Sequence, residues 1–139
     1  MKIITDSIEI STRGYTDIID ITQEVQTVLN KSELTKGSLT VFVSGSTAGV
    51  TTIEYEPGLL KDLPEAFEKV APIGVTYHHD ATWGDGNGYA HVRAALLGAS
   101  FTVPFKKGRL LLGTWQQLVV IDFDNRPRRR SVVVQMMGE

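Results

Sequence analysis

The sequence contains no cysteine, which excludes disulfide bonds and thiolate chemistry and leaves histidine and carboxylate side chains as the ligands of any metal site. No apolar run approaches the roughly 20 residues of a membrane-spanning helix. The charges nearly balance, with 14 Lys and Arg against 16 Asp and Glu. That balance argues against a general nucleic-acid-binding protein, although a local basic patch remains open.

The N-terminal segment alternates like a strand and lacks the apolar centre of a signal peptide, so we expect a cytoplasmic protein without membrane attachment. The 139 residues contain neither a repeat nor a convincing linker. A chain of this length can bury one core of its own. We therefore expect a single domain that spans residues 1–139.

Hydrophobic periodicity predicts both strands and helices in the first part of the chain. Residues 2–11 alternate like a strand. Across residues 20–32 the apolar residues recur on one helical face, which predicts a helix. Asp20 is the expected N-cap of that helix, and Gln23 lies where it would complete a capping box.

The middle of the chain continues this mixture. Residues 38–43 and 51–56 are predicted strands, residues 59–70 a helix, and residues 90–97 a further helix that ends at Gly98.

The last third is predicted to be almost entirely β-structure. Apolar runs cover residues 101–105, 109–115, 116–123 and 131–137, with turn residues between them. The run at 116–123 is apolar on both faces, which is typical of a strand buried on both sides. We predict an antiparallel meander here and, for the whole chain, an α+β fold in which antiparallel sheets are packed by two or three helices.

One segment, YHHDATWGDGNGYAH at residues 77–91, contains all three histidines of the chain. We place His79 at the end of a strand and His91 near the start of a helix, so that the loop between them can bring the two imidazoles and Asp85 together. Two histidines and a carboxylate can hold a divalent ion such as zinc or magnesium with positions open for substrate. His91 is also a candidate proton donor or acceptor.

A structural role for the same segment stays open. Asp-Gly-Asn-Gly is a common turn sequence, and the glycines around Asn87 can serve only that turn. His78 and His79 would point to opposite faces of a strand, so His78 is expected to pack or face solvent. Arg93 lies two residues beyond His91 and points elsewhere on an ideal helix.

The segment SGSTAGV is a second candidate, because the hydroxyls of Ser46 and Thr47 can hold a phosphate or another polar substrate. It lacks the spacing and the lysine of a phosphate-binding P-loop, so a tight turn explains it equally well. Trp115 and Gln116 form a third candidate, as a stacking surface for a heterocycle or as ordinary core packing.

The run RPRRR at residues 126–130 places four guanidinium groups within five positions. Such a run can bind phosphate or nucleic acid. Given the acidic total, we interpret it as a solvated turn that blunts a sheet edge, and nucleic acid as an unlikely partner.

Taken together, the motifs SGSTAGVTTIEYEPGLL, H-x3-W-x-DGNG-x-AHVRAALLG and GRLLLGTWQQ, followed by RPRRR and VVVQMMGE, resemble the YjbQ-like family, also called the secondary thiamine-phosphate synthase family. The resemblance is strong from Phe42 to Glu139. It implies a compact α+β domain that assembles as a homotrimer. It also implies a weak thiamine-phosphate synthase activity, which joins hydroxymethylpyrimidine diphosphate to thiazole phosphate and releases pyrophosphate.

The resemblance assigns candidate site residues by position. It maps the family's histidine and acid motif onto His79, Asp85, Asn87 and His91, and its GTWQ motif onto Trp115 and Gln116. Many bacterial relatives carry His-Thr-Thr-Ala where this chain has Gly45-Ser46-Thr47-Ala48. A site in this chain would therefore contain one imidazole fewer.

Overall fold

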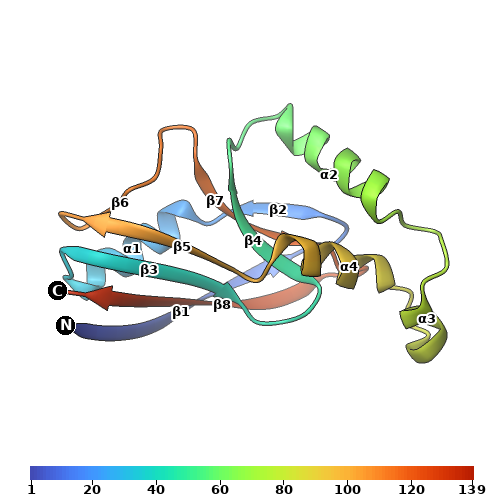
Figure 1. Ribbon diagram of the computed structural model, residues 1–139, viewed down its shortest axis with the longest axis horizontal. Coiled ribbons are helices and arrows are strands. Elements are labelled where there is room, and N and C mark those ends of the chain that lie inside the picture. Colours follow the sequence, from blue (N-terminus) through green and yellow to red (C-terminus); the bar gives the residue numbers. More distant parts are fainter.

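The protein is described by a computed structural model that covers all of residues Met1–Glu139. Two antiparallel sheets lie against each other and enclose the main apolar core, and helices cover the smaller sheet on its other side (Figure 1). This arrangement confirms the predicted α+β class. The elements, in chain order, are β1 (Lys2–Thr12), β2 (Asp17–Asp20), α1 (Thr22–Ser32), β3 (Lys36–Val43), β4 (Ala48–Ile53), α2 (Leu59–Val70), α3 (His78–Trp83), α4 (Gly88–Leu97), β5 (Ser100–Lys106), β6 (Arg109–Leu110), β7 (Gln117–Asp122) and β8 (Arg128–Gly138).

The larger sheet has the strand order β1-β8-β3-β5-β6, and the smaller one has the order β2-β7-β4. Strand β7 is the centre of the smaller sheet and is buried on both faces, as its apolar run predicts. Leu118 and Val120 face the core between the sheets, together with the inner face of α1. Val119 and Ile121 face a second core beneath α4 and α2.

Helix α1 begins after Asp20, whose carboxylate accepts hydrogen bonds from the Thr22 backbone N–H at 2.9 Å and from the Thr22 hydroxyl at 2.7 Å. The predicted capping box is wrong, because the cap residue is Ile21 and no side chain completes the return bond. Inward-facing Val25 and Leu29 are fully buried, as the periodicity predicts.

Helix α2 projects from the body of the molecule (Figure 1) and has no fully buried residue. Its apolar stripe still reaches the second core, where the Phe67 ring packs edge-on against Phe123 with centroids 4.8 Å apart. None of the four helices is long and apolar enough to cross a membrane.

Arg93 joins α4 to the rest of this layer. Its buried guanidinium donates to the Ala71 carbonyl and to the Thr16 hydroxyl, both at 2.9 Å, and pairs with Glu68 at 2.7 Å. It thus connects α4 with α2 and with the turn before β2. This arrangement agrees with the expectation that Arg93 points away from the histidines.

The prediction of a C-terminal antiparallel meander is wrong in its connectivity. After the β5–β6 hairpin the chain crosses to the smaller sheet as β7 and then returns to the larger sheet as β8. The expected strand at 109–115 stops at Leu110, because a turn follows in which the Gly113 N–H donates to the Gln116 side chain. Strand β8 lies between β1 and β3, so it is central and not an edge.

We predict that Arg93→Ala lowers the free energy of unfolding by about 2–5 kcal/mol, because it leaves the buried Ala71 carbonyl and Thr16 hydroxyl without their donor. Chemical denaturation measures the change. Arg129→Ala is the matched control. Arg129 is exposed and its ion pair with Glu9 is long, at 3.8 Å, so the replacement should cost less than about 1 kcal/mol. Equal losses in the two variants would contradict the anchoring role of Arg93.

Candidate functional site

A cavity of about 490 Å³ opens where the loop after β3, the corner between α3 and α4, and the start of β8 meet. Trp83 is the one hydrophobic residue of its lining, which consists of Gly45, Ser46, Thr47, His79, Trp83, Asp85, Asn87, His91, Arg128 and Arg130. A second hollow of about 400 Å³ adjoins it and shares Gly45, Ser46 and His91. Six of the eight site residues singled out from the sequence thus lie around one cavity.

The expected strand end at His79 is wrong, because residues 78–83 form the short helix α3. Gly84 ends this helix in the left-handed conformation at φ 70°, where its N–H bonds to the Asp80 carbonyl at 2.7 Å. The Asp80 carboxylate then accepts the Gly88 N–H at 2.9 Å and so caps the first residue of α4. His78, on the same short helix, is exposed.

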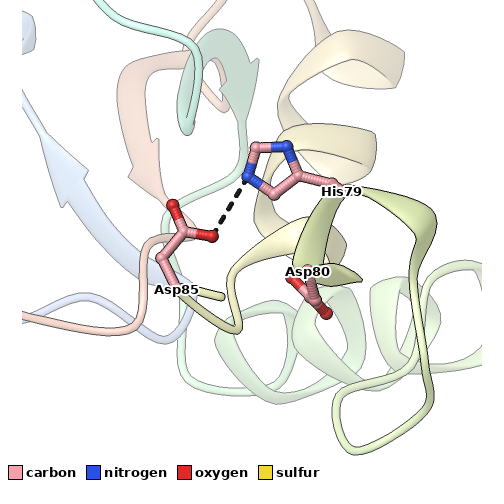
Figure 2. A group of neighbouring side chains, drawn as sticks. All are labelled: His79, Asp80 and Asp85. Carbon is pink, nitrogen blue, oxygen red and sulfur yellow. Dashed lines mark ion pairs between the residues drawn. The ribbon is translucent and has the colours of Figure 1, made fainter. Parts of the chain in front are cut away.

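His79 is the centre of a group of polar side chains from this corner. Its Nε2 atom lies 3.2 Å from Asp85 Oδ1 and 3.1 Å from Asn87 Oδ1. Figure 2 marks the contact between His79 and Asp85 by a dashed line. The His91 ring comes from α4 and lies beside that of His79, with ring centroids 4.2 Å apart and planes inclined by 43°. The structure therefore brings together all four residues of the predicted histidine and acid motif.

The carboxylate of Asp80 also belongs to this group. His79, Asp80 and Asp85 offer ligand atoms that all lie within 4.8 Å of one another, close enough for one metal ion. Sequence analysis did not single out Asp80, because on a strand it would have faced away from His79. In helix α3 the Asp80 carboxylate lies close enough to His79 and Asp85 to act as a further ligand. One of its oxygens already accepts the Gly88 N–H.

Two fully buried carboxylates, Asp122 and Asp124, lie beneath the cavity at the end of β7. Arg130 donates to both oxygens of Asp122, with bonds of 2.7 and 3.0 Å. Arg128 donates to Asp124 at 2.7 Å. Residues 128 and 130 share one face of β8, because side chains alternate along a strand.

The interpretation of residues 126–130 as a solvated edge turn is therefore wrong for Arg128 and Arg130. Arg130 is buried, and both side chains point at carboxylates in the interior, whereas Arg126 and Arg129 remain exposed. The signal for this pairing was present in the sequence. Asp122 and Asp124 occupy alternate positions at the end of an otherwise apolar strand. Arg128 and Arg130 occupy alternate positions at the start of the next strand.

Asp124 fixes the orientation of the Asn87 amide. Its Oδ1 accepts from Asn87 Nδ2 at 3.2 Å, which turns the amide oxygen of Asn87 toward His79. Burial alone would raise the pKa of Asp124. The Asn125 N–H, the Asn87 amide and the Arg128 guanidinium bond to the ionised form and outweigh burial, so the pKa lies below its usual 3.8. An ionised carboxylate accepts only, and the Asn87 amide group must therefore donate to it.

Thr47 belongs to the same buried network, and Ser46 does not. The Thr47 hydroxyl accepts from Arg130 at 2.7 Å and donates to Asp124 at 3.2 Å. Its bonds are therefore used within the protein. Ser46 is exposed at the cavity wall, where its hydroxyl is accessible to a ligand.

The predicted residues Trp115 and Gln116 are not brought to this cavity within the chain. They precede β7, whereas the buried acids lie at its other end, and six strand residues span about 20 Å. Gln116 instead bonds to the Gly113 N–H and to the Thr52 hydroxyl. Trp115 is exposed, so the alternative of core packing is wrong.

Burial and the neighbouring His79 lower the pKa of His91 below its usual 6.5. Its ring is therefore neutral near pH 7 and can accept a proton or a metal ion. Around the cavity, the carboxylates of Asp80, Asp85, Asp122 and Asp124 outnumber the guanidiniums of Arg128 and Arg130. This excess of negative charge favours a cation.

The sequence from residue 6 to residue 139 matches the model of the YjbQ family, described as UPF0047 protein YjbQ-like. The chain belongs to this family. A UPF0047 protein from Archaeoglobus fulgidus is 38% identical over 92% of this chain and 97% of its own length. YugU of Bacillus subtilis, also a UPF0047 protein, is 35% identical over 95% of this chain and 98% of its own.

Solved structures agree with this assignment. A YbjQ-like protein of unknown function from Sulfolobus solfataricus superposes with a TM-score of 0.94 at 31% identity, over 99% of both chains. A hypothetical protein from Aeropyrum pernix gives a TM-score of 0.91 at 32% identity, over 98% of this chain and 99% of its own. The family and the fold follow from these matches.

We predict that stability falls when the pH drops below about 4 and that Asp124→Asn flattens this dependence. Since the pKa of Asp124 is lower in the folded chain than its usual 3.8, its stabilising contribution is present above that value and is lost as the pH falls through the folded pKa. Denaturation between pH 2 and 7 measures it. Asp62→Asn, at an exposed position of α2, should keep the wild-type profile.

Proposed function

We propose that the cavity binds a divalent cation at His79 and Asp85 and, next to it, the phosphate or diphosphate group of a small molecule. The observation that carries this proposal is the convergence of three atoms: His79 Nε2 lies 3.2 Å from Asp85 Oδ1 and 3.1 Å from Asn87 Oδ1. These three atoms can all act as metal ligands. Asp80 offers a further ligand atom within 4.8 Å of those of His79 and Asp85, and the His91 ring lies beside that of His79.

The charges of the cavity support this order of binding. Both guanidiniums are already paired with buried carboxylates, so they neutralise little of an incoming phosphate. A divalent ion offsets the remaining negative charge and offers open positions to phosphate oxygens. The exposed Ser46 hydroxyl and the outer N–H groups of Arg128 provide further donors at the wall.

The donor set suits zinc and magnesium differently. Imidazole nitrogen is a common ligand of zinc, whereas magnesium prefers carboxylate and carbonyl oxygens and keeps several waters. The set contains both types, from His79 and His91 on one side and from Asp85 and Asn87 on the other. Titration with each ion separately decides between them.

The reaction we propose is thiamine-phosphate synthesis. The ring nitrogen of thiazole phosphate forms a bond to the methylene carbon of hydroxymethylpyrimidine diphosphate. The carbon–oxygen bond to the diphosphate breaks, and pyrophosphate leaves with the electron pair. The bound ion would stabilise the charge on the departing diphosphate. Ser46 and Arg128 would bind its oxygens, and the neutral His91 can hold or accept a proton at the same wall.

A second candidate function is cation or anion binding without turnover. The pairing of Arg128 and Arg130 with Asp124 and Asp122 favours it, since both arginines then serve the architecture of the site more than a reaction. Binding without product formation, measured with both thiamine precursors present, would distinguish this candidate from the transferase.

We predict that His79→Ala and His91→Ala each weaken binding of zinc or magnesium by about tenfold or more and abolish thiamine-phosphate formation, because each removes a ligand or proton carrier from the cavity. Isothermal titration with each ion measures the first effect. Product formation from the two precursors measures the second.

His78→Ala is the matched control, because His78 neighbours His79 on the same short helix and is exposed. It should leave the binding of metal and the formation of product unchanged. If both His79→Ala and His91→Ala bind metal and form product like the wild type while remaining folded, the proposed site is rejected.

We also propose that the protein assembles as a homotrimer through the outer face of the larger sheet. Side chains in the middle of this face form an uncharged row across four strands, namely Thr5, Gln135, Thr40 and Thr102. Exposed apolar side chains flank the row, with Ile3, Phe42 and Met137 each more than 40% accessible. The middle of this face is uncharged and partly apolar, which suits contact with another copy.

Thr40→Arg should therefore dissociate the trimer into monomers, because it introduces a charge at the centre of this face. Sedimentation velocity measures the change in mass. Thr27→Arg makes the same replacement on the exposed side of α1 and should leave the assembly intact. A wild type that sediments as a monomer would refute the trimer, and a trimer that survives Thr40→Arg would refute this face.

A further inference from the structure

We infer that Trp83 forms the aromatic wall of the cavity and that the ligand it receives there is a planar heteroaromatic ring carrying a phosphate or diphosphate group. The inference rests on the proposed binding of phosphate, because it places the ring of the same ligand. It adds the residue that recognises the ring.

The position of Trp83 supports this role. It is the last residue of α3, between the proposed ligands His79 and Asp85, and its side chain lines the same cavity. The indole is nonetheless 72% exposed, so the chain itself buries little of it. A large apolar side chain held among metal-ligand candidates is therefore available to a ligand.

The composition of the cavity narrows the kind of group that Trp83 can contact. It is the one hydrophobic residue among ten lining residues, and eight of the others provide imidazole, hydroxyl, amide, carboxylate and guanidinium groups. An indole offers one flat apolar face, which suits an offset-stacked ring better than a bulky aliphatic group. The rest of the ligand must then be polar.

The size and charge of the cavity indicate a second, anionic end on the ligand. Its volume of about 490 Å³ is suited to a small molecule that extends from Trp83 to the cation ligands. A phosphate at the cation and a ring at Trp83 would occupy both ends. A phosphorylated heteroaromatic compound matches this pairing, whereas inorganic phosphate uses only one end.

The structure assigns this role to Trp83 in preference to Trp115. Both indoles are 72% exposed, but only Trp83 lines the cavity. Trp115 precedes β7 at the end away from the buried acids. Exposure alone therefore does not distinguish the two tryptophans, and position does.

The chain contains only these two tryptophans, so Trp115→Phe leaves Trp83 as the sole indole and Trp83→Phe leaves Trp115. Each variant is titrated with hydroxymethylpyrimidine diphosphate and with pyrophosphate, both in the presence of magnesium, while indole fluorescence is recorded. We expect the ring-bearing diphosphate to quench Trp83 and leave Trp115 unchanged. Pyrophosphate should bind with little quenching of either.

Affinity measurements complete the test. Trp83→Ala should weaken binding of hydroxymethylpyrimidine diphosphate by about 5- to 150-fold and leave pyrophosphate binding unchanged, whereas Trp83→Phe should retain most of the affinity. An exposed side chain at a helix end can be replaced without loss of the fold, and circular dichroism checks this.

Other outcomes overturn the inference. Equal affinity of wild type and Trp83→Ala for the ring-bearing ligand would overturn it alone and leave the phosphate site intact. A Trp83 emission that shifts with protein concentration in the absence of ligand would show that a second copy covers the indole, and would also overturn it. If neither compound binds, the proposed function and this inference both fail.

Discussion

The cavity depends on two carboxylates that have no contact with solvent. Asp122 and Asp124 would be costly to bury alone, because an ionised group loses its hydration in the interior. Here their oxygens accept bonds from Arg130, Arg128, Thr12 and Thr47, and also from backbone N–H groups. The bonds join β7 of the smaller sheet to β8 of the larger one, so the polar network also connects the two sheets.

This network determines what the cavity presents to a ligand. The buried carboxylates of Asp124 and Asp122 neutralise Arg128 and Arg130. The Asn87 amide is held with its oxygen toward His79. The two Arg–Asp pairs have no net charge, and the Asn87 amide has a fixed orientation. His79, Asp85 and His91 therefore determine which ligands the cavity can bind. The apolar cores on both faces of β7 keep the two acids in place.

Much of the fold could be predicted from the sequence, because periodicity reports local burial. The helices at residues 59–70 and 90–97 and the doubly buried run at 116–123 all follow from it. Strand pairing could not be predicted, because hydrogen bonds between β8 and both β1 and β3 join residues far apart in the chain. The assumption that neighbouring strands pair failed where the chain crosses between sheets.

The candidate site was predictable to the extent that its residues lie close in sequence. The segment from His79 to His91 was found as one cluster, although its first residue lies on a helix and not on a strand. Asp122 and Asp124 were missed, because they reach the cavity only through the crossover between the sheets. Trp115 was named from the family resemblance and Trp83 was not singled out, because the sequence does not report which end of β7 faces the cavity.

The bond that the Gly88 N–H donates to the Asp80 carboxylate closes residues 80–88 into a ring that lies outside the two sheets. Apart from Asn87 and Gly88, no residue of this ring is buried. Substitutions there can exchange one chemistry for another without disturbing either sheet. The segment can therefore determine what the cavity binds with little effect on the packing of the two sheets.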